Sequence, residues 1–126
     1  MVVVTSRKEN FAMDVDTGKG TLVGDSAKDR GGSGNYPAPF DLVCSGFACC
    51  LNTNARKVLL EKQIAYDKVI TKVDGDRCDN KVEYQYSIEI IAPKATEEQR
   101  AACVAEAFKR SGIRKVLSSE VSFKQV

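Results

Sequence analysis

The residues best suited to chemistry in this sequence of 126 residues are its five cysteines. Three of them, Cys44, Cys49 and Cys50, fall in one stretch that carries almost no charge. A thiolate is the nucleophilic form of cysteine and the form that binds metals. The sequence has no histidine, which excludes Cys–His and Ser–His–Asp catalysis and imidazole-bound zinc. Arginine, lysine or backbone dipoles must therefore activate any reactive thiol.

The spacing of the cysteines does not support a metal site. Cys49 and Cys50 are adjacent, Cys78 and Cys103 stand alone, and no Cys-x-x-Cys pair occurs. An odd number of cysteines without a leading signal segment is typical of free thiols in a reducing compartment. We therefore expect a cytoplasmic protein that uses neither a metal nor another cofactor.

The composition is that of an ordinary soluble domain, with 43% hydrophobic and 29% charged residues. The net charge of +2, with both signs interspersed, predicts no nucleic-acid partner. No apolar run is long enough to predict a membrane span. The length fits a single domain covering residues 1–126.

The elements that must position the thiols begin with a helix predicted from Pro39 to Lys62. A proline is tolerated in the first turn of a helix, and the apolar residues that follow recur at helical spacing. A second apolar row lies beside the first, so the helix should be buried on more than one side. Cys44 is expected to pack in the core.

Strands and helices are predicted on both sides of this helix. The Gly- and Pro-rich segment 25–38 reads as a loop and 74–80 as a turn. A capping box at Thr96–Gln99 opens a helix that Ser111-Gly112 ends, and a short helix follows. The predicted strands are 2–5, 11–16, 21–23, 64–73, 82–90 and 121–123. This order indicates an α+β fold, with an antiparallel sheet packed on a long central helix.

The string GGSGNYPAPFDLVCSGFACC, in this order of elements, resembles the OsmC/Ohr family. In that family the reactive cysteine follows the loop proline by eleven residues, the spacing of Pro39 and Cys50. The resemblance implies an intertwined homodimer with active sites at the subunit interface. It also implies reduction of organic hydroperoxides by an attacking cysteine, a resolving cysteine and an arginine–glutamate pair.

The sequence departs from the family pattern at two positions. The dipeptide Ser111-Gly112 stands where the family has its resolving cysteine. Phe40 stands where the family has an acidic residue directly after the loop proline. Asp41 follows one position later, and Arg7 stands just after the first strand. The chain is therefore interpreted as a divergent OsmC-like protein without a second, resolving cysteine.

On this interpretation Cys50, Arg7 and Asp41 are the catalytic candidates. Cys50 lies about three turns into its own helix, too far for the helix dipole to activate it, so a guanidinium is expected to do so. The alternative is that Cys50 is an inert buried hydrophobe. Asp41 either pairs with an arginine or favours the helix N-terminus.

The candidates for substrate contact are Phe40, Phe47 and Ser111. Without the resemblance, Ser111 would be interpreted as a helix-end residue. The first functional hypothesis is a one-cysteine cycle in which Cys50 reduces a hydroperoxide or a related electrophile and an external thiol restores it. The second is a non-catalytic module that binds a small apolar ligand at the dimer interface, and an interaction protein without a site is the third.

Overall fold

The computed structural model describes all residues 1–126 and consists of two compact units, residues 1–43 and residues 44–126. None of its helices has the length and apolar character that spanning a membrane requires. The prediction that the whole chain forms one domain stays a prediction.

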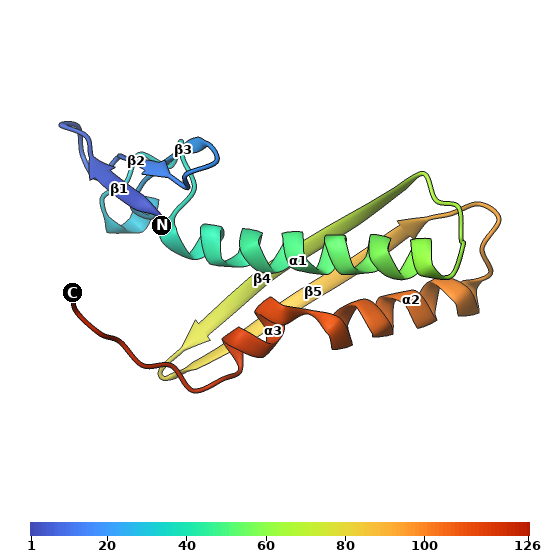
Figure 1. Ribbon diagram of the computed structural model, residues 1–126. Coiled ribbons are helices and arrows are strands. Elements are labelled where there is room, and N and C mark those ends of the chain that lie inside the picture. Colours follow the sequence, from blue (N-terminus) through green and yellow to red (C-terminus); the bar gives the residue numbers. More distant parts are fainter. The chain divides into compact units, whose positions relative to one another are not determined.

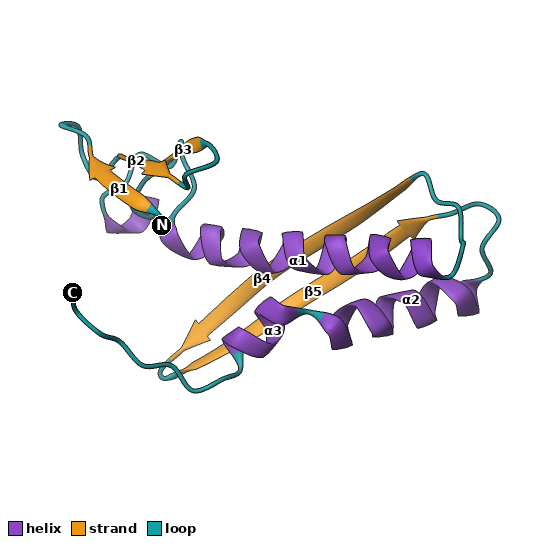
Figure 2. Ribbon diagram, in the orientation of Figure 1, coloured by secondary structure: helices purple, strands orange, loops and turns teal.

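The first unit contains three short strands, β1 (Val3–Ser6), β2 (Met13–Asp16) and β3 (Thr21–Gly24). They form an antiparallel sheet in the order β1-β2-β3. The sequence predicted all three strands and the β2–β3 hairpin within one or two residues. Figure 2 shows this sheet with the loops around it.

The loop after β3 is held by a buried carboxylate. Asp25 is only 1% exposed and accepts hydrogen bonds from the backbone N–H of Ser26 and from both the N–H and the hydroxyl of Ser33. A 3₁₀ helix, η1 (Lys28–Arg30), lies between these two serines. Gly32 passes so close to Ser26 that an added Cβ would lie 1.7 Å from its carbonyl oxygen. The Gly-rich sequence therefore serves a tightly closed loop.

The second unit is built on a long hairpin, β4 (Lys68–Cys78) and β5 (Lys81–Ile91). The helices are α1 (Pro39–Glu61), which begins in the first unit, α2 (Glu97–Arg110) and α3 (Gly112–Leu117). Figure 1 shows α1 and α2 side by side, running in opposite directions along the hairpin. The amide of Asn52 donates to the Val69 carbonyl at 2.9 Å, and Thr71 donates to the Ala48 carbonyl at 3.0 Å. These bonds fix α1 on β4.

The core of this unit lies between the two helices and one face of the hairpin. The buried residues come from α1, from the end of β5 with the segment after it, and from α2, and they are Val58, Leu59, Ile90, Ala92, Ala95 and Cys103. The predicted capping box is present, because Thr96 and Gln99 exchange both hydrogen bonds. The two helix starts and the apolar periodicity of α1 were thus readable from the sequence.

Two predictions about the strands were wrong. The turn expected at residues 74–80 is mostly strand, because β4 continues to Cys78 and pairs along its whole length with β5. Only Asp79 and Asn80 form the turn, with Asp79 at a positive φ of 52°. The strand expected at residues 121–123 is absent, because that segment pairs with no other strand.

Candidate active site around Cys50

The thiol of Cys50 lies where the middle of α1 meets the corner between α2 and α3. The Ser111 hydroxyl donates a hydrogen bond to the Cys50 Sγ at 3.3 Å, and the Asn54 amide donates at 3.4 Å. The backbone N–H groups of Gly112 and Ile113 also donate to it. Donors from two distant parts of the chain therefore converge on one sulfur.

These contacts lower the pKa of the thiol. Burial raises the pKa of Cys50, but the hydrogen bonds from Ser111, from the backbone of Ile113 and Gly112 and from Asn54 outweigh it and hold the pKa below its ordinary value. A hydrogen bond to the charged form of a group favours that form. Cys50 is half-buried, so its sulfur is neither sealed in the core nor fully hydrated. The site therefore stabilises the thiolate more than the surroundings of an ordinary cysteine do.

Ser111 has two structural roles beside its contact with the sulfur. It ends α2, and its side-chain oxygen accepts a hydrogen bond from the backbone N–H of Arg114 in the first turn of α3. The sequence prediction of a helix-end residue is confirmed. Ser111 is completely buried, so its hydroxyl is confined to protein partners. The sequence did not reveal that this hydroxyl points at Cys50.

An aromatic cavity of about 520 Å³ lies on the same face of α1. Phe47, one turn before Cys50, is 2% exposed and contacts Tyr84 and Tyr86 with ring centroids 5.8 and 6.3 Å away. Tyr86 stacks on Phe108 at 4.6 Å. Arg114 is the charged residue in the lining, and its guanidinium lies 5.1 Å from the Phe108 ring centre. The cavity suits an apolar group.

The other cysteines have different surroundings. Cys44 and Cys103 are buried in the core, as expected for Cys44, while Cys49 and Cys78 are exposed. No group of three or more cysteine or acidic side chains lies close enough to hold a metal ion. Cys50 is distinguished by the donors from Ser111 and Asn54 that converge on its sulfur.

Arg7, Phe40 and Asp41, the remaining predicted site residues, belong to the first unit. Arg7 forms an ion pair with Asp14 at 2.6 Å, across the strands β1 and β2. Asp41 accepts a hydrogen bond from the backbone N–H of Ala38 at 2.8 Å, which supports the second of its two predicted roles, at the start of α1. The catalytic roles of Arg7 and Asp41 stay predictions.

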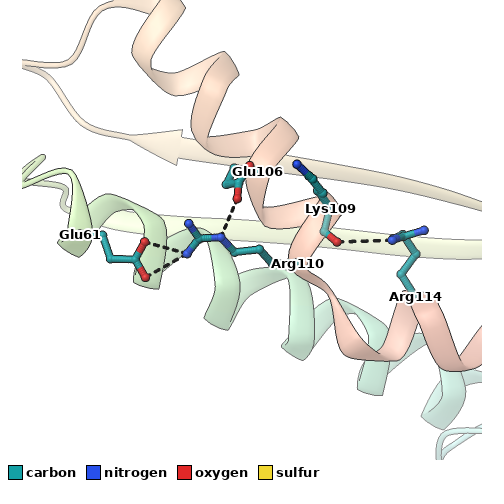
Figure 3. A network of polar contacts seen from close by, with 5 residues as sticks. All are labelled: Glu61, Glu106, Lys109, Arg110 and Arg114. Atoms are coloured by element: carbon teal, nitrogen blue, oxygen red, sulfur yellow. Dashed lines mark hydrogen bonds and ion pairs between the residues drawn. The ribbon is translucent and has the colours of Figure 1, made fainter.

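An ion-pair network joins the ends of α1 and α2 next to this site. Figure 3 shows Arg110 between two carboxylates: its Nη1 is 2.7 Å from Glu61 of α1, and its Nε is 2.7 Å from Glu106 of its own helix. These carboxylates raise the pKa of Arg110, through the hydrogen bond to Glu106 first and that to Glu61 second. The network fixes the residue directly before Ser111.

Sequence reasoning missed three of the donors to the sulfur: Asn54, Gly112 and Ile113. Asn54 was detectable in principle, because it follows Cys50 by four positions on a helix and such residues are neighbours. The backbone donors carry no signal in the side-chain pattern. They add neutral donors that the sequence did not suggest, and activation by a guanidinium stays a prediction.

Comparison with known proteins places this site in a wider context. A family model described as OsmC-like protein matches residues 32–125 of the chain. No curated protein sequence matches it.

Several solved structures share the fold. An OsmC-like protein from Mycoplasma pneumoniae is 19% identical with a TM-score of 0.77, over 93% of this chain and 85% of the other. An organic hydroperoxide resistance protein from Legionella pneumophila is 18% identical with a TM-score of 0.66, over 94% and 89%. An OsmC-like protein of unknown function from Vibrio cholerae is 10% identical with a TM-score of 0.78, over 95% and 94%.

Proposed function

Because the chain belongs to the OsmC-like protein family, we propose that it reduces organic hydroperoxides through the thiol of Cys50. The observation that carries the proposal is the set of donors on the sulfur, from Ser111, Asn54 and the backbone N–H groups of Gly112 and Ile113. An inert core cysteine such as Cys103 needs no such donors. A thiolate is the species that attacks a peroxide.

In the proposed reaction the Cys50 thiolate attacks the terminal oxygen of the hydroperoxide. A sulfur–oxygen bond forms, the oxygen–oxygen bond breaks, and the organic alkoxide takes a proton and leaves as an alcohol. Cys50 is oxidised to a sulfenic acid. Ser111 stands beside the sulfur without a thiol of its own, so it cannot form a disulfide with Cys50.

An external thiol therefore completes the cycle in this proposal. The first thiol molecule condenses with the sulfenic acid to a mixed disulfide and releases water. A second thiol molecule attacks the mixed disulfide, frees the Cys50 thiolate and leaves as the oxidised disulfide. Two electrons enter from the two thiols and two are consumed by the hydroperoxide.

The apolar part of the substrate is proposed to occupy the aromatic cavity. Phe47 is part of the cavity wall and lies one helical turn from Cys50. A group bound in the cavity would therefore lie near the thiol. Ser111 is not part of the cavity wall and is completely buried, so it is proposed to act on the substrate through its contact with the sulfur. Phe40, which belongs to the first unit, is also proposed to contact the substrate.

A homodimer in the cytoplasm is part of the same proposal. The exposed apolar residues Val3, Val4 and Phe11 of the first unit, each more than half exposed, favour burial against a second copy. Arg7 and Asp41 are proposed to assist Cys50 in that dimer, as the family resemblance implies.

Hydroperoxide turnover with a dithiol reductant tests the activity. We expect the unsubstituted chain to consume cumene hydroperoxide and Cys50→Ser to lose that activity. Cys49→Ser, which removes the neighbouring exposed thiol, is the matched control and should retain the rate. If Cys50→Ser turns over as fast as the unsubstituted chain, the proposal is wrong.

A second candidate function is favoured by the cavity itself. Its four aromatic rings can bind an apolar ligand without any reaction, with Cys50 merely nearby. Native mass spectrometry of the purified chain, compared with Phe108→Ala, distinguishes this function from the first. A tightly retained ligand together with no peroxide turnover would favour the binding module.

A further inference from the structure

Arg114 ties the short helix α3 to the end of α2 (Figure 3). Its Nε donates to the Phe108 carbonyl at 3.1 Å, and its Nη2 donates to the Lys109 carbonyl at 3.3 Å. The last carbonyls of a helix have no partner within the helix. The guanidinium of Arg114 thus binds carbonyl groups at the C-terminal end of α2.

The backbone of the same residue orients Ser111. The Arg114 N–H donates to the Ser111 Oγ at 3.2 Å and so occupies one of its lone pairs. A serine hydroxyl has a single hydrogen to donate, and in this buried residue it goes to the Cys50 Sγ. The Ser111 hydroxyl is thereby oriented as a hydrogen-bond donor to the sulfur. A thiolate needs such a donor, because its sulfur can only accept hydrogen bonds.

Beyond the buried Ser111 and the ion pairs of Arg110, side-chain packing encloses little of the corner that carries the donors. The helix α3 has six residues, too few for stability without outside contacts. A Cβ added at Gly112 would meet no atom within 4 Å, so side-chain packing does not enclose this position. After Ser111 the corner therefore depends largely on hydrogen bonds for its place against the sulfur.

We propose that Arg114 is the positioning residue of the Cys50 site, which holds Ser111, Gly112 and Ile113 in donating geometry through its bonds to the end of α2. This inference rests on the proposed function, in which the Cys50 thiolate is the nucleophile. Arg114 does not touch the sulfur in this role. It acts through the planar fork of its guanidinium, which binds two carbonyls at once.

The charge of Arg114 offers a different explanation that experiment can separate. A positive charge near a thiolate stabilises it at a distance, and lysine would supply that charge equally well. Lysine has a single ammonium group and lacks the planar fork. Positioning therefore predicts that Arg114→Lys behaves like Arg114→Met, whereas a charge effect predicts that Arg114→Lys behaves like the unsubstituted chain.

The test measures the reactivity of Cys50 without any peroxide. The full chain carries Cys49→Ser and Cys78→Ser, which remove the two exposed thiols. The rate of Cys50 alkylation by iodoacetamide is followed by peptide mass spectrometry across a pH series. The Arg114→Met variant should react about fivefold more slowly at neutral pH, because weakened hydrogen bonds leave less thiolate. Its rate profile should move to higher pH.

Lys115→Met is the matched control, since Lys115 is the next residue of α3, is exposed and makes no side-chain hydrogen bond. It should leave the profile unchanged, and circular dichroism should show all variants folded. A profile for Arg114→Met equal to that of the parent, or full rescue by Arg114→Lys, overturns the proposal. A strong salt dependence of the parent's own profile would overturn it as well, without any substitution.

The readout separates this inference from the proposed function. Alkylation reports the thiolate alone, so a parent chain that fails to reduce hydroperoxides can still show the Arg114 effect. That result would refute the peroxidase and leave the positioning role standing. If the parent chain reduces hydroperoxides but Arg114→Met leaves alkylation unchanged, the positioning role is refuted and the peroxidase stands.

Discussion

The hydroxyl of Ser111 lies 3.3 Å from the sulfur of Cys50, although the two residues are 61 positions apart in the chain. Ser111 closes α2 and starts α3, while Cys50 is in the middle of α1. The contact therefore forms only because α1 and α2, which are far apart in the sequence, pack together in the second unit. It also sets the donor that distinguishes Cys50 from the other four cysteines.

Replacing Ser111 by alanine should weaken the thiolate. The hydrogen bonds hold the pKa of Cys50 below its ordinary value against the effect of burial, so losing the Ser111 donor should raise that pKa. A smaller thiolate fraction should slow alkylation of Cys50 at neutral pH by about fivefold. Stopped-flow alkylation measures this, with Ser122→Ala in the exposed C-terminal segment as control. An unshifted pH profile would show that the Ser111 contact is unimportant.

Replacing Ser111 by cysteine should create a redox pair. The short distance between the Ser111 hydroxyl and the Cys50 sulfur places a second thiol within reach after small side-chain rotations. In the Ser111→Cys variant, one equivalent of hydroperoxide should then give a disulfide between Cys50 and the introduced thiol. Mass spectrometry of the unreduced protein detects it, and the same substitution combined with Cys50→Ser is the control. A stable sulfenic acid in place of the disulfide would contradict this prediction.

The carboxylate of Asp25 should make the first unit sensitive to acid. Hydrogen bonds from the Ser33 side chain and backbone and from the Ser26 backbone lower the pKa of Asp25, although burial raises it. A group whose pKa is lower in the folded state contributes stability above its ordinary pKa, and the contribution is lost as the pH falls through the folded pKa.

The Asp25→Asn variant should accordingly be less stable at neutral pH and should show a flatter dependence of the free energy of unfolding on pH in acid. Urea unfolding at a series of pH values measures both effects. Asp29→Asn, an exposed acid in η1, serves as the control. Equal acid slopes for Asp25→Asn and the unsubstituted chain would refute the prediction.

Two glycine substitutions should change stability in opposite directions. In Gly32→Ala the new Cβ would lie 1.7 Å from the Ser26 carbonyl oxygen, so the loop must move and about 1–3 kcal/mol should be lost. In Gly46→Ala the new Cβ meets nothing within 4 Å inside α1, so about 0.5–1 kcal/mol should be gained. Chemical denaturation measures both. A stabilised Gly32→Ala would contradict the tight contact seen in the loop.

The sequence alone determined the elements whose signals are local. The spacing of apolar residues in α1, the capping box of Thr96 and Gln99, and the alternation in β5 each act within a few positions, so they can be read along the chain. Cys50 was singled out among its neighbours by the family resemblance, through its spacing from Pro39. The order of these elements was sufficient for the α+β fold, which the solved structures share.

Only the tertiary structure decided what surrounds the thiol and how far the strands extend. Polar residues such as Asp74 and Asp76 signal a turn locally, yet they belong to β4 because β5 supplies their backbone partners. Residues 121–123 alternate like a strand but pair with no other strand. Apart from the nearby Asn54, the donors to Cys50 are backbone N–H groups and a hydroxyl from a distant corner, and helix packing rather than residue type sets the direction of such groups.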